Sequence, residues 1–333
     1  MPKEIHIIGG GLTGLSLAVA LRRHGVPVEL HEAGKYPRHR VCGEFISGVK
    51  SSTLDALGIA HLLADAQKHT TVTWFGGDAQ LSTRELPTPA LAISRHLLDQ
   101  RLCEFAREQG VTIFESSRKK PEPDTPGQAW CAGRRPTNGK WIGLKAHIRD
   151  FHTISDLEMH SGPHGYLGIT AVENGWSNVC GLFRIDRTIK ASHNDLLPAY
   201  LQKNGNLQLA DRLSHAVWKT DSFTAVAGFE LGLQKPIPGL LSLGDSHSII
   251  PPFTGNGMSM AFQSAEIALP ELVKYSNTQQ NWEQTTAAIN LALQSFFSRR
   301  LSASKFIHPF LFQPAARPLL KYAPLKPILS LLR

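Results

Sequence analysis

The spacing of apolar and polar residues along the chain predicts where its strands and helices lie. Near the N-terminus this spacing predicts a βαβ unit. Ile5, Ile7 and Ile8 form a short apolar run that predicts a buried parallel strand. An apolar run beginning at Leu12 has the length and composition of a helix, and residues 26–31 predict a second strand. The chain therefore opens with strand, helix and strand, the pattern of an α/β domain with a parallel sheet.

Further elements follow from the same patterns up to residue 133. Residues 51–66 predict a helix and residues 70–86 predict strands. Residues 96–109 predict a helix that ends at Gly110, since glycine accepts the left-handed conformation of a C-terminal cap. A strand is expected at 111–114. After a polar connection over 115–129, the segment Trp130-Cys-Ala-Gly133 predicts the end of another buried strand.

The remainder predicts a strand-rich second lobe and then a return to the first lobe. Asn174-Gly175 favours a type I′ turn between two apolar runs, which indicates a hairpin. The other predicted elements are strands at 140–149, 165–172, 176–183, 223–231 and 240–245 and helices at 259–274 and 282–301. We thus expect a discontinuous first domain (1–70, 90–140 and 239–275), a β-rich domain (71–89 and 141–238), and a C-terminal helical tail (276–333).

Length and composition narrow the class of protein. With 333 residues, 42% of them hydrophobic, the chain can bury a large core. Its four cysteines are scattered without a CxxC pair, so neither disulfides nor structural zinc is expected. Three of the fifteen histidines, His152, His160 and His164, lie close in sequence, but no HExxH or carboxylate–histidine motif accompanies them, and we expect no metal site.

The net charge of +8 is concentrated in the tail, where residues 299–333 carry seven Lys and Arg and no acid among many aliphatic side chains. Such a segment can lie on an anionic membrane surface. Alternatively, short helices interrupted by five prolines pack on the body of the protein. Nucleic acid binding is not expected, because aliphatic rather than stacking aromatic side chains surround the cations.

Targeting signals are not evident in the sequence. The segment from Lys3 to Ala20 resembles a signal peptide, but Glu4, His6 and four glycines interrupt its apolar core. No apolar run reaches the roughly 18 residues of a spanning helix. We expect a cytoplasmic protein, with membrane contact through the tail as an open alternative.

The first chemical motif is Gly9-Gly-Gly11-Leu-Thr-Gly14, placed between the two predicted strands. Gly9 allows a tight turn, Gly11 lets the backbone approach a pyrophosphate, and Gly14 lets helix and strand pack closely. The following helix directs its positive end at the phosphates. Glu32, at the end of the second strand, can accept hydrogen bonds from an adenosine ribose. The spacing is that of a dinucleotide-binding fingerprint.

The second motif begins at Gly244-Asp245 and runs through a Pro/Gly loop into a helix of small residues. An acid at a strand end can bind the hydroxyls of a sugar-like chain. The helix N-terminus at Gly257-Met258 offers N–H groups and a positive dipole to an electron-rich ring edge, such as that of reduced flavin. Read alone, this stretch could be an ordinary loop that caps a helix; the first motif makes the flavin interpretation preferable.

Together the motifs GGGLTG…Glu32 and GDSHSIIPPFTGNGMSMAFQSAE resemble the FAD-dependent superfamily of p-hydroxybenzoate hydroxylase. Within it, YPRHRVCGEFISG and GYLGITAVENGWSNVCGL are most similar to the geranylgeranyl-reductase-like and related monooxygenase branch. The resemblance implies FAD, a Rossmann-like α/β domain and an inserted, mostly antiparallel substrate domain. It implies these FAD-binding residues: Gly9, Gly11, Leu12, Thr13, Gly14, Glu32, Ala33, Arg40, Arg95, Asp245, Pro252, Gly255, Gly257 and Met258.

The sequence departs from this family in two places. The family's middle motif usually ends a strand with Ala-(Asp or Thr)-Gly, whereas this chain has Cys131-Ala132-Gly133 after a shortened 115–129 segment. The tryptophan-halogenase motif WxWxIP is also absent. With one dinucleotide fingerprint, the chain has no separate NAD(P)H domain, so NAD(P)H would bind transiently or a partner protein would donate the electrons.

By the same resemblance, the loop around Cys42 faces the substrate side of the flavin. Catalytic candidates are Cys42, which could equally fill buried space, Glu44, which could be an acid/base or a loop ion pair, and His247, which could reach the ring or cap its loop. Three functions remain open: a monooxygenase hydroxylating a hydrophobic aromatic or polyketide-like molecule with NAD(P)H and O2, a reductase of prenyl or lipid double bonds, and a binding protein without turnover.

Overall fold

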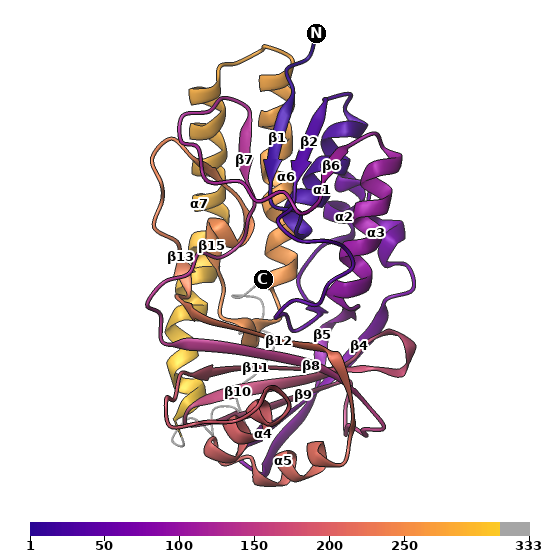
Figure 1. The fold of residues 1–333 in the computed structure, drawn as a ribbon, viewed down its shortest axis with the longest axis vertical. Helices are drawn as coiled ribbons and strands as arrows, with labels where there is room; N and C mark the ends of the chain where they lie inside the picture. Colours follow the sequence, from indigo (N-terminus) through magenta and orange to yellow (C-terminus); the bar gives the residue numbers. More distant parts are fainter. Residues whose placement is uncertain (314–333) are drawn as a thin grey trace.

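The computed structural model describes residues 1–313, which form two lobes (Figure 1). The upper lobe contains a five-stranded parallel sheet, as the βαβ pattern predicts. β1 pairs with β2 on one side and with β7 on the other. In spatial order the strands are β14 (Leu241–Ser242), β7 (Gln128–Trp130), β1 (Ile5–Ile8), β2 (Val28–His31) and β6 (Thr112–Phe114).

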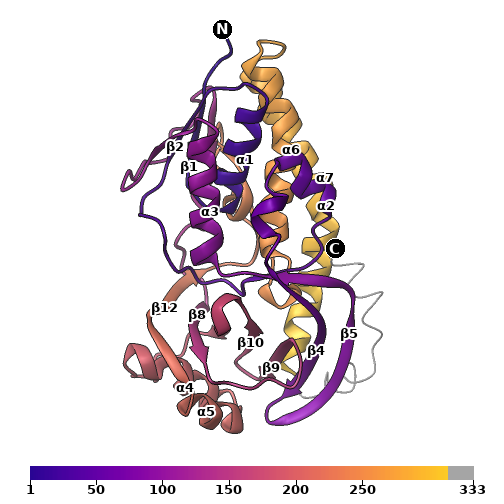
Figure 2. The ribbon, with the colours of Figure 1, turned by 90° about the vertical axis from the view of Figure 1, so that its right-hand side faces the viewer.

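The helices of this lobe pack beside the sheet, and α1 lies at their centre. α1 contacts α3 and α6, while α7 packs against α6, and Figure 2 shows β1 and β2 to one side of α1, α6 and α7. Their shared core is fully enclosed, with Leu15, Leu17 and Phe262 at 0% exposure. The helices are α1 (Leu12–Arg23), α2 (Ser51–Leu57), α3 (Arg95–Glu108), α6 (Gly257–Ser276) and α7 (Trp282–Ile307).

The lower lobe is an eight-stranded mixed sheet that curls beneath the first (Figure 1). Every neighbouring pair is antiparallel except β4 and β9, which run parallel. In spatial order the strands are β12 (Val217–Phe229), β8 (Trp141–Arg149), β11 (Ser177–Arg184), β10 (Gly165–Ala171), β9 (Leu157–Gly162), β4 (Gln67–Gly76), β5 (Ala79–Ala92) and β3 (Phe45–Ile46). The predicted fold class is confirmed.

The predicted hairpin is present between β10 and β11. Asn174 and Gly175 both have positive φ, 58° and 71°, and the Trp176 N–H donates to the carbonyl of Glu173. These are the features of the type I′ turn that the Asn-Gly pair favours.

Two helices of the lower lobe were not expected from the sequence. α4 (His193–Lys203) and α5 (Leu207–Ser214) cover one face of the large sheet and bury Leu201 and Leu213 completely. Pro198 inside α4 obscures its helical pattern, because proline is unfavourable in a helix interior. Strand β9 was also not predicted. The expected helix at 51–66 is divided, since Gly58 (φ 72°) ends α2 before the short 3-10 helix η1 (Ala60–Leu63).

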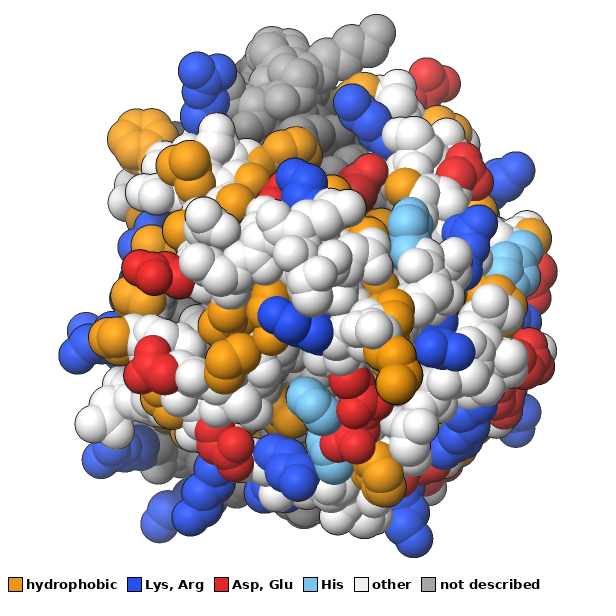
Figure 3. Space-filling view, turned by 90° about the horizontal axis from the view of Figure 1, so that it is seen from above, with side chains coloured by type: hydrophobic (Ala, Val, Ile, Leu, Met, Phe, Trp, Pro, Cys, Tyr) orange, Lys and Arg blue, Asp and Glu red, His pale blue; other side chains and the backbone are white. Residues whose placement is uncertain are grey.

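The chain ends, within the described residues, at the short helix η5 (His308–Phe312). Arg300, counted among the basic tail residues, is 4% exposed and donates to Gln263 from α7. The predictions for residues 314–333 lie outside the described part of the chain. Over residues 1–313, no helix is both long enough and apolar enough to cross a membrane. Basic and acidic side chains are interspersed over the end of the molecule seen from above (Figure 3).

Candidate flavin site

The three fingerprint glycines serve distinct geometric purposes. Gly9 has φ 112°, and a Cβ there would lie 2.4 Å from the backbone of Cys131, at the end of β7. A Cβ on Gly14 would lie 2.0 Å from the carbonyl oxygen of Gly9, so the close packing of helix on strand requires glycine. A Cβ on Gly11, in contrast, meets no atom nearer than Arg95 Nη2 at 3.8 Å. The backbone at Gly11 is therefore open toward a ligand.

Helix α1 begins at this opening without a capping side chain. Its N-cap is Gly11, and no side chain bonds its first turn. The unbonded N–H groups of a helix N-terminus, with the positive end of the dipole, form an anion-binding position. Leu12 and Thr13, in the first turn, line the same cavity as Gly11. The sequence therefore supplies a backbone surface suited to a diphosphate.

Glu32 follows β2 and holds the glycine turn in place by hydrogen bonds to its backbone. Its carboxylate is buried and accepts the N–H groups of Gly10 (2.9 Å) and Gly34 (2.8 Å). It also pairs with Arg38 (2.6 Å) and Arg40 (3.3 Å). Because Glu32 lines the cavity as well, it can meet the ribose of a bound nucleotide while holding this loop in shape.

Two arginines converge on a single buried carboxylate next to Gly11. Arg95 binds Asp99 through two hydrogen bonds of 2.7 and 2.8 Å, and Arg40 Nε donates to the same carboxylate at 3.0 Å. Burial opposes the charge of Arg95, but the facing Asp99 carboxylate outweighs it and raises the pKa of the guanidinium. With the Arg38–Glu32 pair included, three cations face two anions, which leaves positive charge at the phosphate position.

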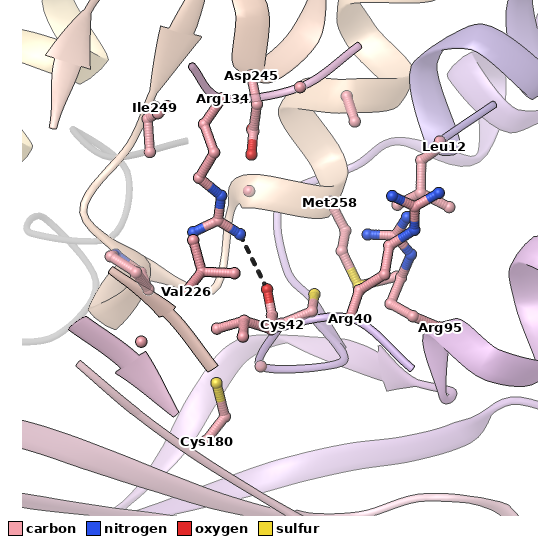
Figure 4. A pocket seen from close by; sticks show the side chains of 18 of the residues that line it. Leu12, Arg40, Cys42, Arg95, Arg134, Cys180, Val226, Asp245, Ile249 and Met258 are labelled. Atoms are coloured by element: carbon pink, nitrogen blue, oxygen red, sulfur yellow. Dashed lines mark hydrogen bonds between the residues drawn. The ribbon is translucent and has the colours of Figure 1, made fainter. Parts of the chain in front are cut away.

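One cavity of about 870 Å³ joins the two lobes. In Figure 4, Leu12, Arg40 and Arg95 lie on one side and Val226, Ile249 and Cys180 on the other, with Cys42 between them. The cavity has the size of a cofactor or substrate pocket. Of the predicted FAD-binding residues, all but the packing residue Gly14 line it: Gly9, Gly11, Leu12, Thr13, Glu32, Ala33, Arg40, Arg95, Asp245, Pro252, Gly255, Gly257 and Met258.

The second motif forms the far side of the cavity. Asp245 lies in the short 3-10 helix η3 (Gly244–Ser246) after β14, and no residue in 1–313 forms a hydrogen bond or ion pair with its carboxylate. Gly255 (φ 66°) makes the turn before α6, and a Cβ there would lie 2.9 Å from the Phe45 ring. Gly257 and Met258 begin α6 at the cavity wall. An unpaired acid and an uncapped helix start suit a polyhydroxylated chain bearing an electron-rich ring.

The three catalytic candidates are placed differently. Cys42 lines the cavity and is half-buried, and its Sγ accepts the N–H of Glu44 at 3.4 Å. Glu44 and His247 do not line it. His247 is half-buried beside Ser248 Oγ (3.2 Å), and burial lowers its pKa. The structure therefore brings only Cys42 to the cavity.

Glu44 instead forms the centre of a buried polar cluster between the lobes. It is 0% exposed and accepts from His147 Nε2 (2.6 Å) and from the backbone N–H of Arg95 (2.9 Å), and it pairs with Lys145 (3.3 Å). Burial alone would raise the pKa of Glu44, but the bond from His147 and the charge of Lys145 hold it below its usual value. These contacts correspond to the ion-pair alternative.

The lower lobe contributes an apolar wall that the sequence analysis did not assign. Trp74, Met159, Tyr166 and Phe229 come from four strands and line the cavity together. Alternating apolar residues in each strand were a visible signal, but which strands meet at one wall depends on the sheet order. Arg134 and Arg135, directly after the altered middle motif, also line the cavity and were not predicted. Arg134 donates to the Val41 carbonyl (3.1 Å).

Of the three histidines considered as metal ligands, His160 has its ring engaged by other side chains. His160 is buried, donates from Nε2 to the Glu158 carboxylate (3.0 Å) and stacks on Phe75. In the described part of the chain, Glu4, His6 and Glu29 lie with potential ligand atoms within 4.8 Å of one another, on the partly exposed side of β1 and β2. Exposed acidic groups commonly gather without an ion.

Comparison with known proteins now identifies the fold. Residues 3–127 match the family of FAD binding domains. The match indicates an FAD-binding domain in the N-terminal part of the chain. The cavity fits FAD, because Gly11 is open, Asp245 has no partner within residues 1–313, and positive charge lies near α1.

Several solved structures have the same fold. The flavin-dependent brominase Bmp2 is 17% identical with a TM-score of 0.76, over 99% of this chain and 93% of that one. A geranylgeranyl bacteriochlorophyll reductase-like protein from Thermoplasma acidophilum is 16% identical with a TM-score of 0.74, over 99% and 95% of the two chains. Identities at this level establish the fold and leave the reaction open.

Two of the sequence matches to curated relatives are shorter. A hydroxysqualene dehydroxylase of Sinorhizobium fredii is 44% identical over 55 residues, 16% of this chain and 13% of that protein. A menaquinone reductase of Mycobacterium tuberculosis is 26% identical over 115 residues, 33% of this chain and 28% of that protein. The matches thus span a small part of these relatives.

Proposed function

We propose that this FAD-dependent oxidoreductase is a monooxygenase that hydroxylates a hydrophobic aromatic or polyketide-like molecule with NAD(P)H and O2. The observation that carries the proposal is the continuous cavity, with a nucleotide-binding end beside α1 and an apolar end on the curled sheet. The apolar end contains Trp74, Tyr166 and Phe229 among its lining residues, which suits an aromatic or aliphatic substrate.

Within this proposal, FAD would supply the electron transfer, and the chain's own residues would hold and shield the reactants. Gly11, Arg40 and Arg95 would hold the diphosphate end, and Asp245 would bind the hydroxylated chain. The apolar wall would exclude water from the substrate side, which strengthens the electrostatic interactions inside. Cys42 lies between the two ends and is the candidate to contact the substrate.

A second candidate is a reductase of prenyl or lipid double bonds. Two similarities favour it: the menaquinone reductase match in sequence and the geranylgeranyl bacteriochlorophyll reductase-like protein in fold. Both candidates require a flavin and a hydrophobic substrate, so the same apolar wall serves either one.

The test begins with the visible absorption spectrum of the purified protein, before and after addition of FAD. Bound flavin would support both reactions, whereas a colourless protein that refuses FAD would contradict them and favour a binding protein without turnover. Incubation with NAD(P)H, an alkylphenol and isotopically labelled O2 then follows. Label in the product supports the monooxygenase. Anaerobic oxidation of NAD(P)H with an isoprenoid quinone, and saturation of its side chain, would instead support the reductase.

If neither nicotinamide reduces the bound flavin, the electron donor is a separate protein. The absence of a second dinucleotide fingerprint in the sequence is compatible with either route. Photochemical reduction of the bound flavin, followed by the same labelled O2 experiment, separates the donor question from the reaction itself.

A further inference from the structure

Two arginines of the cavity wall have no anionic partner among residues 1–313. Arg134 and Arg135 follow the altered middle motif, so the resemblance assigns them no role. Both are half-buried and line the cavity. Arg134 donates to the Val41 carbonyl, and within the described residues the Nε and Nη2 groups of Arg135 are buried without a hydrogen-bond partner. Because buried N–H groups are nearly always bonded, an acceptor on a ligand in the cavity would satisfy them.

The guanidinium of Arg134 lies at the apolar wall and apart from the predicted diphosphate position. It is 5.0 Å from the ring centroid of Phe229, which packs in one buried cluster with Tyr166. Figure 4 shows Arg134 on one side of the cavity, with Arg40 and Arg95 on the other. A group bound by Arg134 could therefore belong to a molecule whose body contacts the apolar wall.

The cavity carries more positive charge than a diphosphate would balance. Seven of its described lining residues are Lys or Arg, and two, Glu32 and Asp245, are acids. Asp99, which pairs with Arg40 and Arg95, adds a third anion, and a bound diphosphate would add two further negative charges. The seven cations would then face five negative charges, which leaves two positive charges in excess. Excess charge in a cavity with low-dielectric walls attracts a further anion.

We propose that Arg134 and Arg135 bind an anionic head group, a carboxylate or a phosphate, of a ligand whose hydrophobic body lies against the apolar wall. A guanidinium presents paired N–H groups that match both anions, and its planar face stacks on aromatic rings, as at Phe229. The inference rests on the proposed function for one point, namely that this ligand is the substrate. The substrate class then narrows from hydrophobic molecules to amphiphilic acids.

The experiment is titration calorimetry of the oxidised, FAD-loaded full chain, without NAD(P)H, against three ligands: para-pentylbenzoate, para-pentylphenyl phosphate and para-pentylbenzyl alcohol. The three share a hydrophobic body and differ in the head group. The test variant R134M/R135M removes both charges, and R134K/R135K keeps the charges without the paired N–H groups. The matched control is R118M, since Arg118 lines the same cavity next to Ser117, whose N–H donates to the Glu32 carbonyl at the nucleotide end.

We expect at least one of the two acids to bind about tenfold or more tightly than the alcohol, because hydrogen bonds between charged groups contribute at this level. The tighter acid identifies the head group. R134M/R135M should remove the preference for the acid, R134K/R135K should keep part of it, and R118M should leave it unchanged. FAD content and thermal unfolding are measured on each variant. If the double variant does not fold, R135M takes its place, because it breaks no hydrogen bond within residues 1–313.

Three results would refute the proposal. The first is equal binding of both acids and the alcohol to wild type. The second is an equal loss of preference in R118M, because the effect would then come from the overall charge of the cavity. The third is an unchanged preference in R134M/R135M, whether or not that variant loses FAD or its reduction by NADPH, since the arginines would then serve the cofactor or the electron donor.

The failure of this proposal can be told apart from failure of the proposed function. Labelled product from an alkylphenol, together with equal binding of the acids and the alcohol, contradicts only the head-group site. An arginine-dependent preference for the acid without any turnover contradicts only the proposed reaction. If the purified protein refuses FAD, the same titrations on the FAD-free chain still test the two arginines.

Discussion

Replacement of Glu44 by Gln should destabilise the protein strongly, although Glu44 does not line the cavity. The substitution preserves the shape of the side chain but removes the one carboxylate within residues 1–313 that pairs with Lys145, and Lys145 is 0% exposed. In the same described residues Lys145 has one other polar contact, His39 Nδ1 at 3.1 Å, which carries no compensating negative charge. The variant therefore leaves a buried ammonium group without a counter-ion.

The magnitude follows from that orphaned charge. Breaking a buried ion pair by removing one partner costs about 3–5 kcal/mol. For a chain of this size, that corresponds to a fall in melting temperature of roughly 4–7 °C. The matched control is Glu122→Gln, which removes the same charge from an exposed position and should change stability by less than about 0.5 kcal/mol.

The double variant E44Q/K145M provides the discriminating measurement. Replacing both members of a buried pair is often neutral or stabilising, because no charge is left without a partner. E44Q/K145M should therefore melt at a higher temperature than E44Q. Thermal unfolding followed by tryptophan fluorescence, with FAD content measured in parallel, tests this. A double variant less stable than E44Q would refute the reasoning, since it would show that Lys145 stabilises the fold without Glu44.

The remaining predictions concern pH, cofactor binding and packing. The folded protein lowers the pKa of Glu44, so the contribution of Glu44 to stability is present above about pH 4.3 and is lost as the pH falls toward the folded pKa. Acid unfolding of wild type should therefore be steeper than that of E44Q/K145M. Gly11→Val and Asp245→Ala should abolish FAD binding without loss of the folded lower lobe, as judged by circular dichroism; full flavin occupancy in either would overturn its assignment. Gly14→Ala should destabilise the upper lobe, since its Cβ would overlap the Gly9 carbonyl. In the control Gly257→Ala, the added Cβ meets no atom within 4 Å, so the melting temperature should equal that of wild type.

Local signals in the sequence predicted those parts of the structure that depend on near neighbours. The glycine turn, α1 and the Asn174-Gly175 hairpin each follow from residues within about twenty positions of one another. The glycine fingerprint and Asp245 could also be placed at a common site, because both lie at the carboxyl ends of parallel strands of one sheet.

Features that depend on distant pairing could not be predicted. Glu44 meets Lys145 and His147 across about a hundred residues, and nothing in its own loop distinguishes a catalytic acid from this ion pair. Likewise, the sequence of neither strand alone predicts that β4 pairs in parallel with β9. α4 and α5 were missed because the apolar face that they cover becomes evident only when the large sheet has formed.

The order of strands in the parallel sheet also limits when this protein can acquire its cofactor during synthesis. β14 pairs with β7, and Asp245 and the start of α6 follow it, so the last part of the nucleotide lobe emerges from the ribosome after the entire lower lobe. A fragment such as 1–127 would lack both β7 and β14 and would expose one edge of β1. The nascent chain must therefore remain soluble with an unfinished sheet until β14 has emerged, and with an unfinished helical layer until α6 and α7 have followed. Flavin supplied at that stage would act as a late assembly factor, binding the completed lobe and drawing folding to completion by mass action.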